Sequence, residues 1–225
     1  MVSYMNESHF KPFNEHEKVR IYRRSLPHWR QYGCTYFVTF RTGDSLPASV
    51  VRNINDEQRS WLCGRGIVFE TGEEICDVLS RLPHEDLHHF HISFCRAVNR
   101  HLDECHGRCL LSDIKFSKMV MSALLHFDGK RVWIGDAVIM PNHVHVLMCP
   151  IGDNELEDIL CSIKSFSARQ INSVTGESGT NFWQRDTYDH IVRNRIELNA
   201  YIKYIDGNPD KANISACQYL YRQAV

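Results

Sequence analysis

The chain has 225 residues, enough to bury a sizeable core in one or two domains, and its 43% hydrophobic and 24% charged residues are typical of a soluble globular protein. No apolar run reaches the roughly 18 residues that a membrane-spanning helix needs, and the first residues, MVSYMNESHF, lack the apolar centre of a signal peptide. Nine cysteines without close repeated pairs favour reduced thiols over a disulfide framework. The sequence therefore predicts a cytoplasmic protein without a membrane partner.

Charge is distributed unevenly along the chain, although the net charge is only −1. Residues 1–42 carry seven Lys and Arg against three Asp and Glu, whereas residues 43–113 carry seven against twelve, and residues 161–225 carry eight against six. A phosphate-binding surface would therefore be local and built from the two basic ends. Ordinary surface variation also produces asymmetry of this size, and charge alone favours neither interpretation.

The first half of the chain is predicted to contain a basic arm, a strand and a helical insert. Residues 1–30 form the arm, which is polar and irregular and contains Arg20, Arg23, Arg24 and Arg30. β-Branched and aromatic residues predict a strand over 34–40. Apolar residues at helical spacing predict a helix over 48–63, with further helices over 73–79 and 88–102. These helices belong to an acidic insert at about 48–110. Its many His and Cys residues leave a structural zinc site open, but their spacings fit no common template, and the favoured interpretation is a helical insert with solvated histidines.

The second half is predicted to complete a single domain over residues 31–225. Ser112 and Asp113 cap a helix that runs to about residue 125, and a strand over 131–139 follows. A turn at Pro141 and Asn142 leads into a second strand, and helices follow over 155–171 and 195–207. Pro209 is predicted to end the last helix.

The stretch MPNHVHVLM at 140–148 carries two histidines separated by one aliphatic residue. On a β-strand, residues two apart point to the same face, so His143 and His145 project together while the alternate aliphatic residues point into a core. Two neighbouring imidazoles can ligate one divalent ion and leave most of its coordination sphere open for a substrate. The simpler interpretation of so short a motif is a pair of surface histidines on a half-buried strand.

Two stretches near the C-terminus carry further candidates. FWQRD at 182–186 mixes aromatic and charged residues, which suits base stacking and phosphate contact but is also typical of loop anchors. Tyr201, Tyr204 and Asn208 share one face of the last predicted helix. On spacing alone, the favoured interpretation is that both tyrosines are core aromatics.

Several stretches in chain order resemble the REP-associated tyrosine transposases, a group of the single-tyrosine HUH transposases. The histidine strand resembles the motif of two histidines around a hydrophobic residue that gives the HUH group its name. The resemblance also covers YFVTFR at 36–41 with DSLP at 44–47, KSFSAR at 164–169 with IN at 171–172, FWQ at 182–184, and YI followed by NP at 204–209. Residues 64–110 match the group least.

This resemblance implies an α+β fold with a ferredoxin-like antiparallel sheet and helices on one face. It also implies a metal-dependent single-stranded DNA endonuclease and strand transferase that acts at hairpin-forming repeats through a covalent 5′-phosphotyrosine. By the same resemblance, His143, His145 and Asn208 ligate Mg²⁺ or Mn²⁺, and Tyr204 is the nucleophile. Tyr201 and Tyr188 are rival nucleophiles, but only Tyr204 is followed by an asparagine one helical turn later.

The expected partner is single-stranded or hairpin DNA. Phosphate contacts are expected from Lys164, Arg169, Arg185 and Arg193, with base stacking on Trp183 and further contacts from the basic arm. His190 is expected to be structural. Two other functions stay open: a domesticated DNA-binding or regulatory protein that recognises hairpin repeats without strand transfer, and a metal-dependent hydrolase without a covalent step. Both a monomer and a homodimer are compatible with the sequence.

Overall fold

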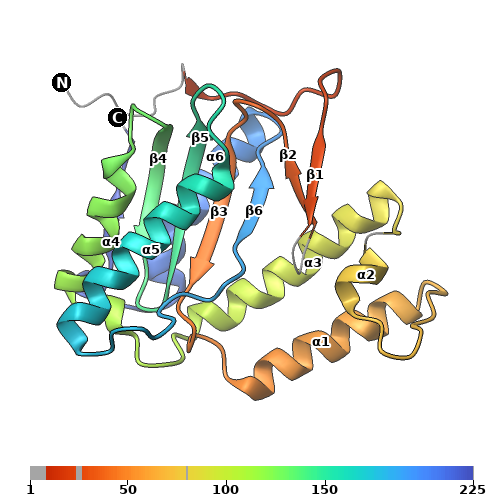
Figure 1. Cartoon of the computed structure of the whole chain (residues 1–225), viewed down its shortest axis with the longest axis horizontal. Coiled ribbons are helices and arrows are strands. Elements are labelled where there is room, and N and C mark those ends of the chain that lie inside the picture. The colour runs from red at the N-terminus through yellow and green to blue at the C-terminus, as the bar shows by residue number, and fades with distance from the viewer. Residues whose placement is uncertain (1–8, 24–26, 80, 225) are drawn as a thin grey trace.

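The computed structural model describes residues 9–23, 27–79 and 81–224, and a five-stranded antiparallel sheet lies at its centre (Figure 1). The strand order is β6-β3-β5-β4-β7, so the histidine strand β5 is central and is buried along its whole length. These strands are β3 (Tyr36–Arg41), β4 (Val132–Ile139), β5 (His143–Pro150), β6 (Tyr188–Ile191) and β7 (Leu220–Arg222). The predicted α+β class with an antiparallel sheet is confirmed.

The first face of the sheet is covered by α4 (Ile114–His126) and α5 (Leu156–Thr175), which lie side by side in front of it in Figure 1. Alternate residues of β5, namely Val144, Val146 and Met148, are fully buried in the core between the sheet and these helices. The alternation that the sequence predicts for this strand is therefore confirmed.

The opposite face of the sheet is covered by α6 (Arg195–Lys211). Val138 of β4, Leu147 of β5 and Ile205 of α6 form a second buried cluster there. The prediction of helices on one face thus holds for α4 and α5, whereas α6 lies on the other face. The physical reason is that β5 buries side chains on both of its faces, so both faces need a cover.

Helix α6 continues through Pro209 to Lys211, which corrects the prediction that it ends before the proline. The backbone N–H of Ala212 donates to the carbonyl of Asn208 at 3.0 Å, so the last turn stays closed although the proline has no N–H of its own. Asn208 therefore keeps a helical position one turn after Tyr204.

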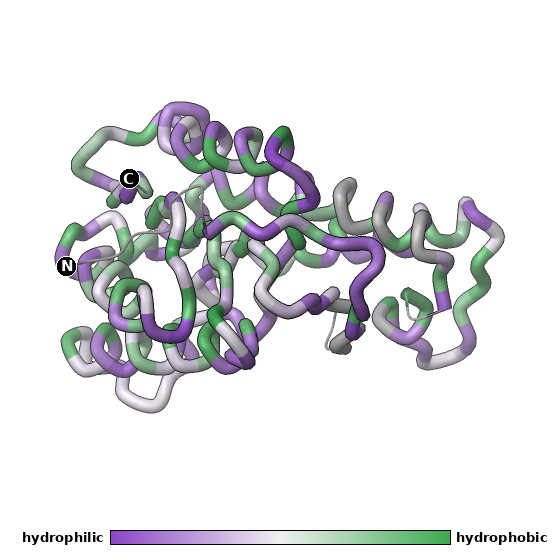
Figure 2. The backbone as a smooth tube through the Cα atoms, turned by 90° about the horizontal axis from the view of Figure 1, so that it is seen from above, coloured by the Kyte–Doolittle hydropathy of each residue, from purple (hydrophilic) through white to green (hydrophobic). Residues whose placement is uncertain are grey.

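The helical insert projects from one end of the sheet and contains α1 (Ala48–Cys63), α2 (Ile75–Leu79) and α3 (His84–Asp103). Figure 2 shows these helices extending to one side of the rest of the molecule. They share a small core of their own, which includes Leu62, Phe90 and Phe94. A short 3-10 helix, η2 (Leu110–Ser112), then leads into α4. None of the helices that the structure describes is long and apolar enough to cross a membrane.

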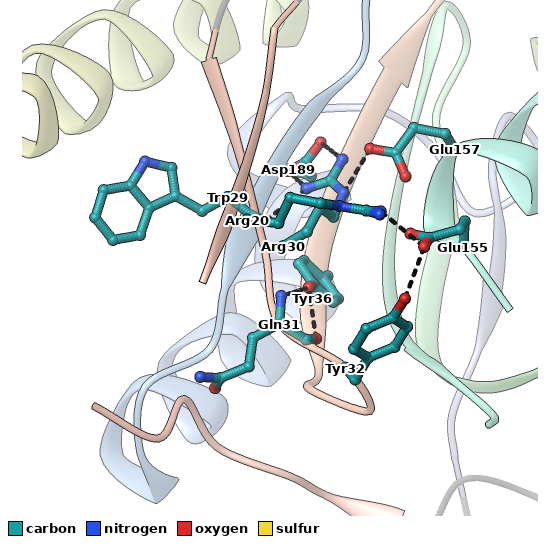
Figure 3. Close-up of polar contacts among 9 residues, drawn as sticks. All are labelled: Arg20, Trp29, Arg30, Gln31, Tyr32, Tyr36, Glu155, Glu157 and Asp189. Atoms are coloured by element: carbon teal, nitrogen blue, oxygen red, sulfur yellow. Dashed lines mark hydrogen bonds and ion pairs between the residues drawn. The ribbon is translucent and has the colours of Figure 1, made fainter. Parts of the chain in front are cut away.

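The N-terminal arm contains a two-stranded antiparallel hairpin, β1 (Arg20–Arg23) with β2 (Pro27–Arg30), where the sequence predicts irregular chain. Residues 1–8 and 24–26, and with them Arg24, lie outside the described residues. Two other arginines of the arm form internal ion pairs with β6 and the start of α5 (Figure 3). The basic arm is therefore tied to the domain by charges that the sequence analysis assigns to DNA.

Arg30 makes the more buried of these contacts, since it is only 6% exposed. Its guanidinium donates two hydrogen bonds to the carboxylate of Asp189, at 2.5 and 2.9 Å, and one to Glu157 at 2.6 Å. Arg20 pairs with Glu155 at 2.7 Å nearer the surface (Figure 3). A buried bidentate pair of this kind is the geometry in which loss of one partner is most costly.

We expect Asp189→Asn to lower the free energy of unfolding by about 3 kcal/mol, because it leaves the buried guanidinium with Glu157 as its remaining carboxylate. Urea denaturation followed by circular dichroism measures this change. The double variant Arg30→Met with Asp189→Leu removes both charges and should be less destabilised than Asp189→Asn alone. Equal losses in the two proteins would contradict the assignment of the cost to an unpaired buried charge.

Candidate functional site

The two histidines of β5 lie side by side beneath α6, and both side chains are fully buried. Their ring centroids are 4.6 Å apart, and their Nε2 atoms face each other at 3.1 Å. The interpretation of His143 and His145 as surface histidines is therefore wrong, since the strand is central and α6 covers this face.

The outer nitrogen of each imidazole has a hydrogen-bond partner. The amide nitrogen of Asn142 donates to the carbonyl of His106 at 2.9 Å, which turns its oxygen towards Nδ1 of His143 at 2.8 Å. That oxygen can only accept, so His143 carries its proton on Nδ1 and presents a lone pair on Nε2. His145 Nδ1 lies 2.7 Å from the hydroxyl of Thr39, which can donate or accept.

Burial keeps both imidazoles neutral near neutral pH. It lowers the pKa of His143 to about 3 and the pKa of His145 well below its ordinary value, with Lys211 acting in the same direction on both. The neutral imidazole is the form that ligates a metal. The two facing Nε2 atoms can share one proton in the absence of a cation, or both can bind a common cation when the Thr39 hydroxyl accepts from His145.

Helix α6 places Tyr204 and Asn208 against the histidines. The ring of Tyr204 meets the ring of His145 edge to face, with centroids 5.1 Å apart. The side-chain amide of Asn208 opposes the effect of burial on the pKa of both His143 and Tyr204. Among the described residues, neither the phenol oxygen of Tyr204 nor the amide oxygen of Asn208 has a hydrogen-bond partner, although both atoms are buried. Two such atoms beside an imidazole pair indicate a site built for a ligand.

The end of α3 contributes a carboxylate that the sequence analysis missed. Asp103 accepts a hydrogen bond from the amide nitrogen of Asn208 at 3.2 Å and forms an ion pair with Lys211. Because Asp103 accepts from the amide nitrogen, the unpartnered amide oxygen of Asn208 is the atom left to bind a ligand. No local pattern in the sequence marks this aspartate, since its partners lie more than 100 residues further along the chain.

The phenol of Tyr204 is poorly ionised in this environment. Burial and the charge of Asp103 both raise its pKa above the ordinary value of 10. The ammonium group of Lys211 lies 5.6 Å from the centre of the phenol ring. A reaction that needs the phenolate therefore requires additional positive charge at the site.

The two rival tyrosines have other surroundings. Tyr201 stacks on Phe37 with ring centroids 4.2 Å apart, and Tyr188 meets the same phenylalanine edge to face at 6.4 Å. Within the described part of the chain, Tyr204 is the one of the three whose ring contacts His145. His190 bonds to Glu197 through Nε2 at 2.9 Å, which supports a structural role.

The structure separates the residues expected to contact DNA. Arg169 and Arg185 are exposed and line one groove with Lys164 on the α5 side of the sheet, away from the histidine face. The Lys164 ammonium is engaged there, donating to the carbonyls of Gln184 and Arg185 at 2.7 and 3.0 Å and to a threonine hydroxyl at 3.2 Å. Arg193 is exposed and lines a different groove beside the N-terminal arm.

Trp183 does not have the placement that base stacking requires. Its indole is only 7% exposed, donates to the hydroxyl of Ser167 at 3.0 Å, and packs edge to face against Phe40 and Phe182. The expectation that it stacks on DNA is corrected accordingly, because the ring faces are already covered by the core.

The donor atoms beneath α6 fit a divalent cation. Two ligands about 2.1 Å from one ion and about 90° apart are separated by about 3 Å, and the two Nε2 atoms lie 3.1 Å apart. The unpartnered oxygen of Asn208 supplies a third donor. Among the described residues, no group of three or more His, Cys, Asp or Glu side chains can hold a metal ion, in the insert or elsewhere. The histidine pair with the asparagine amide is therefore the candidate metal site.

With divalent ions removed by a chelator, we expect the free energy of unfolding to fall as the pH drops below 6.5. The unfolded imidazoles take up protons there, whereas His143 resists protonation to about pH 3 and His145 also stays neutral. Each imidazole contributes at most about 1.4 kcal/mol per pH unit. Urea denaturation between about pH 7 and about pH 5 measures the slope. The double variant His143→Gln with His145→Gln should show a flatter dependence, and equal slopes would contradict the shifted pKa values.

The segment that carries this site matches a known protein family. Residues 121–208 match the family model described as IS200-like transposase, and this segment contains both histidines, Tyr204 and Asn208. A solved structure described as a REP-associated tyrosine transposase bound to a REP hairpin is 18% identical, with a TM-score of 0.45, and the alignment covers 84% of this chain and 72% of that chain. No curated protein matches the chain. Over residues 121–208, the family match confirms the resemblance to the single-tyrosine transposases that the sequence motifs indicate.

Proposed function

We propose that this protein is a metal-dependent single-stranded DNA endonuclease and strand transferase with Tyr204 as its nucleophile. The observation that carries the proposal is the pair of buried, unpartnered oxygens on Tyr204 and Asn208 beside two neutral imidazoles. Most buried polar atoms in folded proteins are paired, and here two unpaired oxygens belong to the same helix that covers the two imidazoles. Their position inside the segment that matches the IS200-like transposases supports the same chemistry.

His143 and His145 would hold Mg²⁺ or Mn²⁺ through their Nε2 atoms, and Asn208 through its amide oxygen. When bound, such an ion polarises a phosphate oxygen and offsets the negative charge that develops during cleavage. Asn142 and Thr39 orient the imidazoles from behind, in the manner of the outer partners that commonly fix metal-ligating histidines. Asp103 orients the amide of Asn208 in the same way.

In the proposed reaction, the phenol oxygen of Tyr204 attacks phosphorus and loses its proton. The bond between phosphorus and the 3′ oxygen breaks, and that oxygen takes up a proton to leave a free 3′ hydroxyl. The segment downstream of the cut stays attached to Tyr204 through its 5′ phosphate, as a 5′-phosphotyrosine. A second 3′ hydroxyl can then attack this phosphotyrosine and join two strands without an external energy source.

The proposed substrate is a single strand beside a hairpin-forming repeat, as the resemblance to the REP-associated transposases implies. Arg169, Arg185 and Arg193 are exposed and remain candidates for phosphate contacts. Lys164 holds the loop that carries Arg185, so its contribution to DNA binding would be indirect.

We expect labelled single-stranded oligonucleotides with a hairpin repeat from the host genome to form a covalent adduct with the protein in Mg²⁺ or Mn²⁺. The adduct should be lost in Tyr204→Phe and in His143→Gln, and it should persist in Tyr201→Phe, the matched control one turn earlier on α6. Denaturing gels measure it.

Other outcomes of this assay would support other functions. Cleavage that survives Tyr204→Phe would identify a hydrolase without a covalent step. Binding without an adduct, with both metals and both hairpin orientations, would identify a protein that recognises repeats without strand transfer.

We expect Asp103→Ala to weaken Mn²⁺ binding by about 10- to 100-fold, because the amide of Asn208 loses the bond that orients it. Isothermal titration calorimetry measures the affinity. Asp103→Asn keeps an acceptor for the amide and should retain most of the affinity, whereas Asp210→Ala, at an exposed position of α6, should not change it. Equal losses in Asp103→Ala and Asp103→Asn would point to simple loss of charge instead of positioning.

A further inference from the structure

A cleft of about 480 Å³ lies between the helical insert and the histidine-bearing face of the sheet. Helices α1 and α3 form one wall, and β3, β6 and the segment before β6 form the other. In Figure 1 these helices lie beside the end of the sheet at which β3 finishes. The volume falls within the range of sites that bind small ligands and is sufficient for one nucleotide.

The cleft begins next to the candidate site. Thr39, whose hydroxyl meets Nδ1 of His145 at 2.7 Å, is also one of the residues that line the cleft. Leu102 lines it from α3 and immediately precedes Asp103, the residue that holds Asn208. A strand with one phosphate at the histidines would therefore have its neighbouring nucleotide at the mouth of this cleft.

An arginine next to the histidine strand lines this cleft. Arg41 pairs with His143 across β3 and β5, and its guanidinium donates to the hydroxyl of Ser45 at 3.0 Å. Among the described residues, no carboxylate forms an ion pair with it, and burial lowers its pKa, with Asp186 opposing that effect from a distance. A half-buried cation held in this way is suited to a phosphate group.

The rest of the lining suits an uncharged ring. Phe94, Val98 and Leu102 supply an apolar wall from α3, and the amide side chains of Asn55, Asn99 and Gln184 supply donors and acceptors. The charged lining residues are Arg41 and Arg59 on one side of the balance and Glu74 and Asp186 on the other. Because two positive and two negative charges cancel, the cleft as a whole does not attract anions. An apolar wall with amides is how proteins read the face and edge of an unstacked base.

We propose that this cleft binds one unstacked nucleotide of the single strand next to the cleaved phosphate, with Arg41 on its phosphate and the amides on its base. The proposal rests on the proposed function and makes the insert the element that selects the sequence beside the cut. Binding of this nucleotide would be the role of the helical insert, whose residues 64–110 resemble the family least.

The test measures binding in the Tyr204→Phe background, so that cleavage is not needed for the readout. Fluorescence anisotropy would follow hairpin oligonucleotides that carry one abasic site at each flanking position in turn. We expect one position to lose about tenfold in affinity when its base is removed. Arg41→Gln should weaken binding by about tenfold. Asn99→Leu, which replaces one amide of the lining by an apolar group of similar size, should reduce the difference between the intact and abasic oligonucleotides at that position.

Arg52→Gln is the matched control, because this arginine is exposed on α1 and does not line the cleft. Circular dichroism melting would show that the Arg41→Gln and Asn99→Leu proteins are folded. A flat abasic scan, together with unchanged affinity in both variants, would overturn the proposal even if the wild-type protein forms the covalent adduct. Dependence of binding on Arg41 and on one base, without an adduct in the wild-type protein, would sustain the cleft and overturn the strand transferase.

Discussion

The burial of two imidazoles on the central strand is the constraint on which the rest of the site depends. A buried polar nitrogen needs a partner, and the fold provides one for each Nδ1 while leaving the two Nε2 atoms to face each other. Helix α6 covers this face of the sheet and brings Tyr204 and Asn208 to the two histidines. The site is therefore built from a strand and a helix and not from surface loops. This placement holds the histidines, Tyr204 and Asn208 in fixed positions, but it also buries the phenol.

The segment that resembles the family least supports the residues that resemble it most. At its far end the insert has a separate small core, but its near end reaches the site through Asp103 on the amide of Asn208 and through the carbonyl of His106 on Asn142. These contacts orient the amide of Asn208 and, through Asn142, the imidazole of His143. The insert is therefore coupled to the site through named hydrogen bonds, and its helices also wall the adjoining cleft.

Local periodicity predicted most of the elements, and long-range partners account for what it missed. The alternation of β5 and the i, i+4 spacing of Tyr204 and Asn208 depend on near neighbours and could be read from the sequence. The sequence places Arg30 in a basic arm and suggests DNA contact, because its partner Asp189 lies 159 residues away and cannot be recognised from local sequence. Only the fold brings the two residues together. Trp183 is a plausible stacking residue on sequence alone, because the residues around it give no sign that the core buries its ring. Strands β6 and β7 are too short to show a recognisable alternation of apolar and polar residues, so the sequence does not predict them.

The raised pKa of Tyr204 sets an electrostatic condition on the proposed chemistry. A unit charge about 4 Å away, at an effective dielectric constant of about 20, contributes about 4 kcal/mol, which corresponds to about three pKa units. Lys211 cannot supply this alone, because Asp103 pairs with it and itself raises the pKa of the phenol. Positive charge held between the imidazoles and the Asn208 oxygen would act against the effect of burial on the phenol. In the proposed reaction, the burial that keeps the imidazoles neutral, and so able to bind a cation, is therefore also what makes a cation necessary for attack by Tyr204.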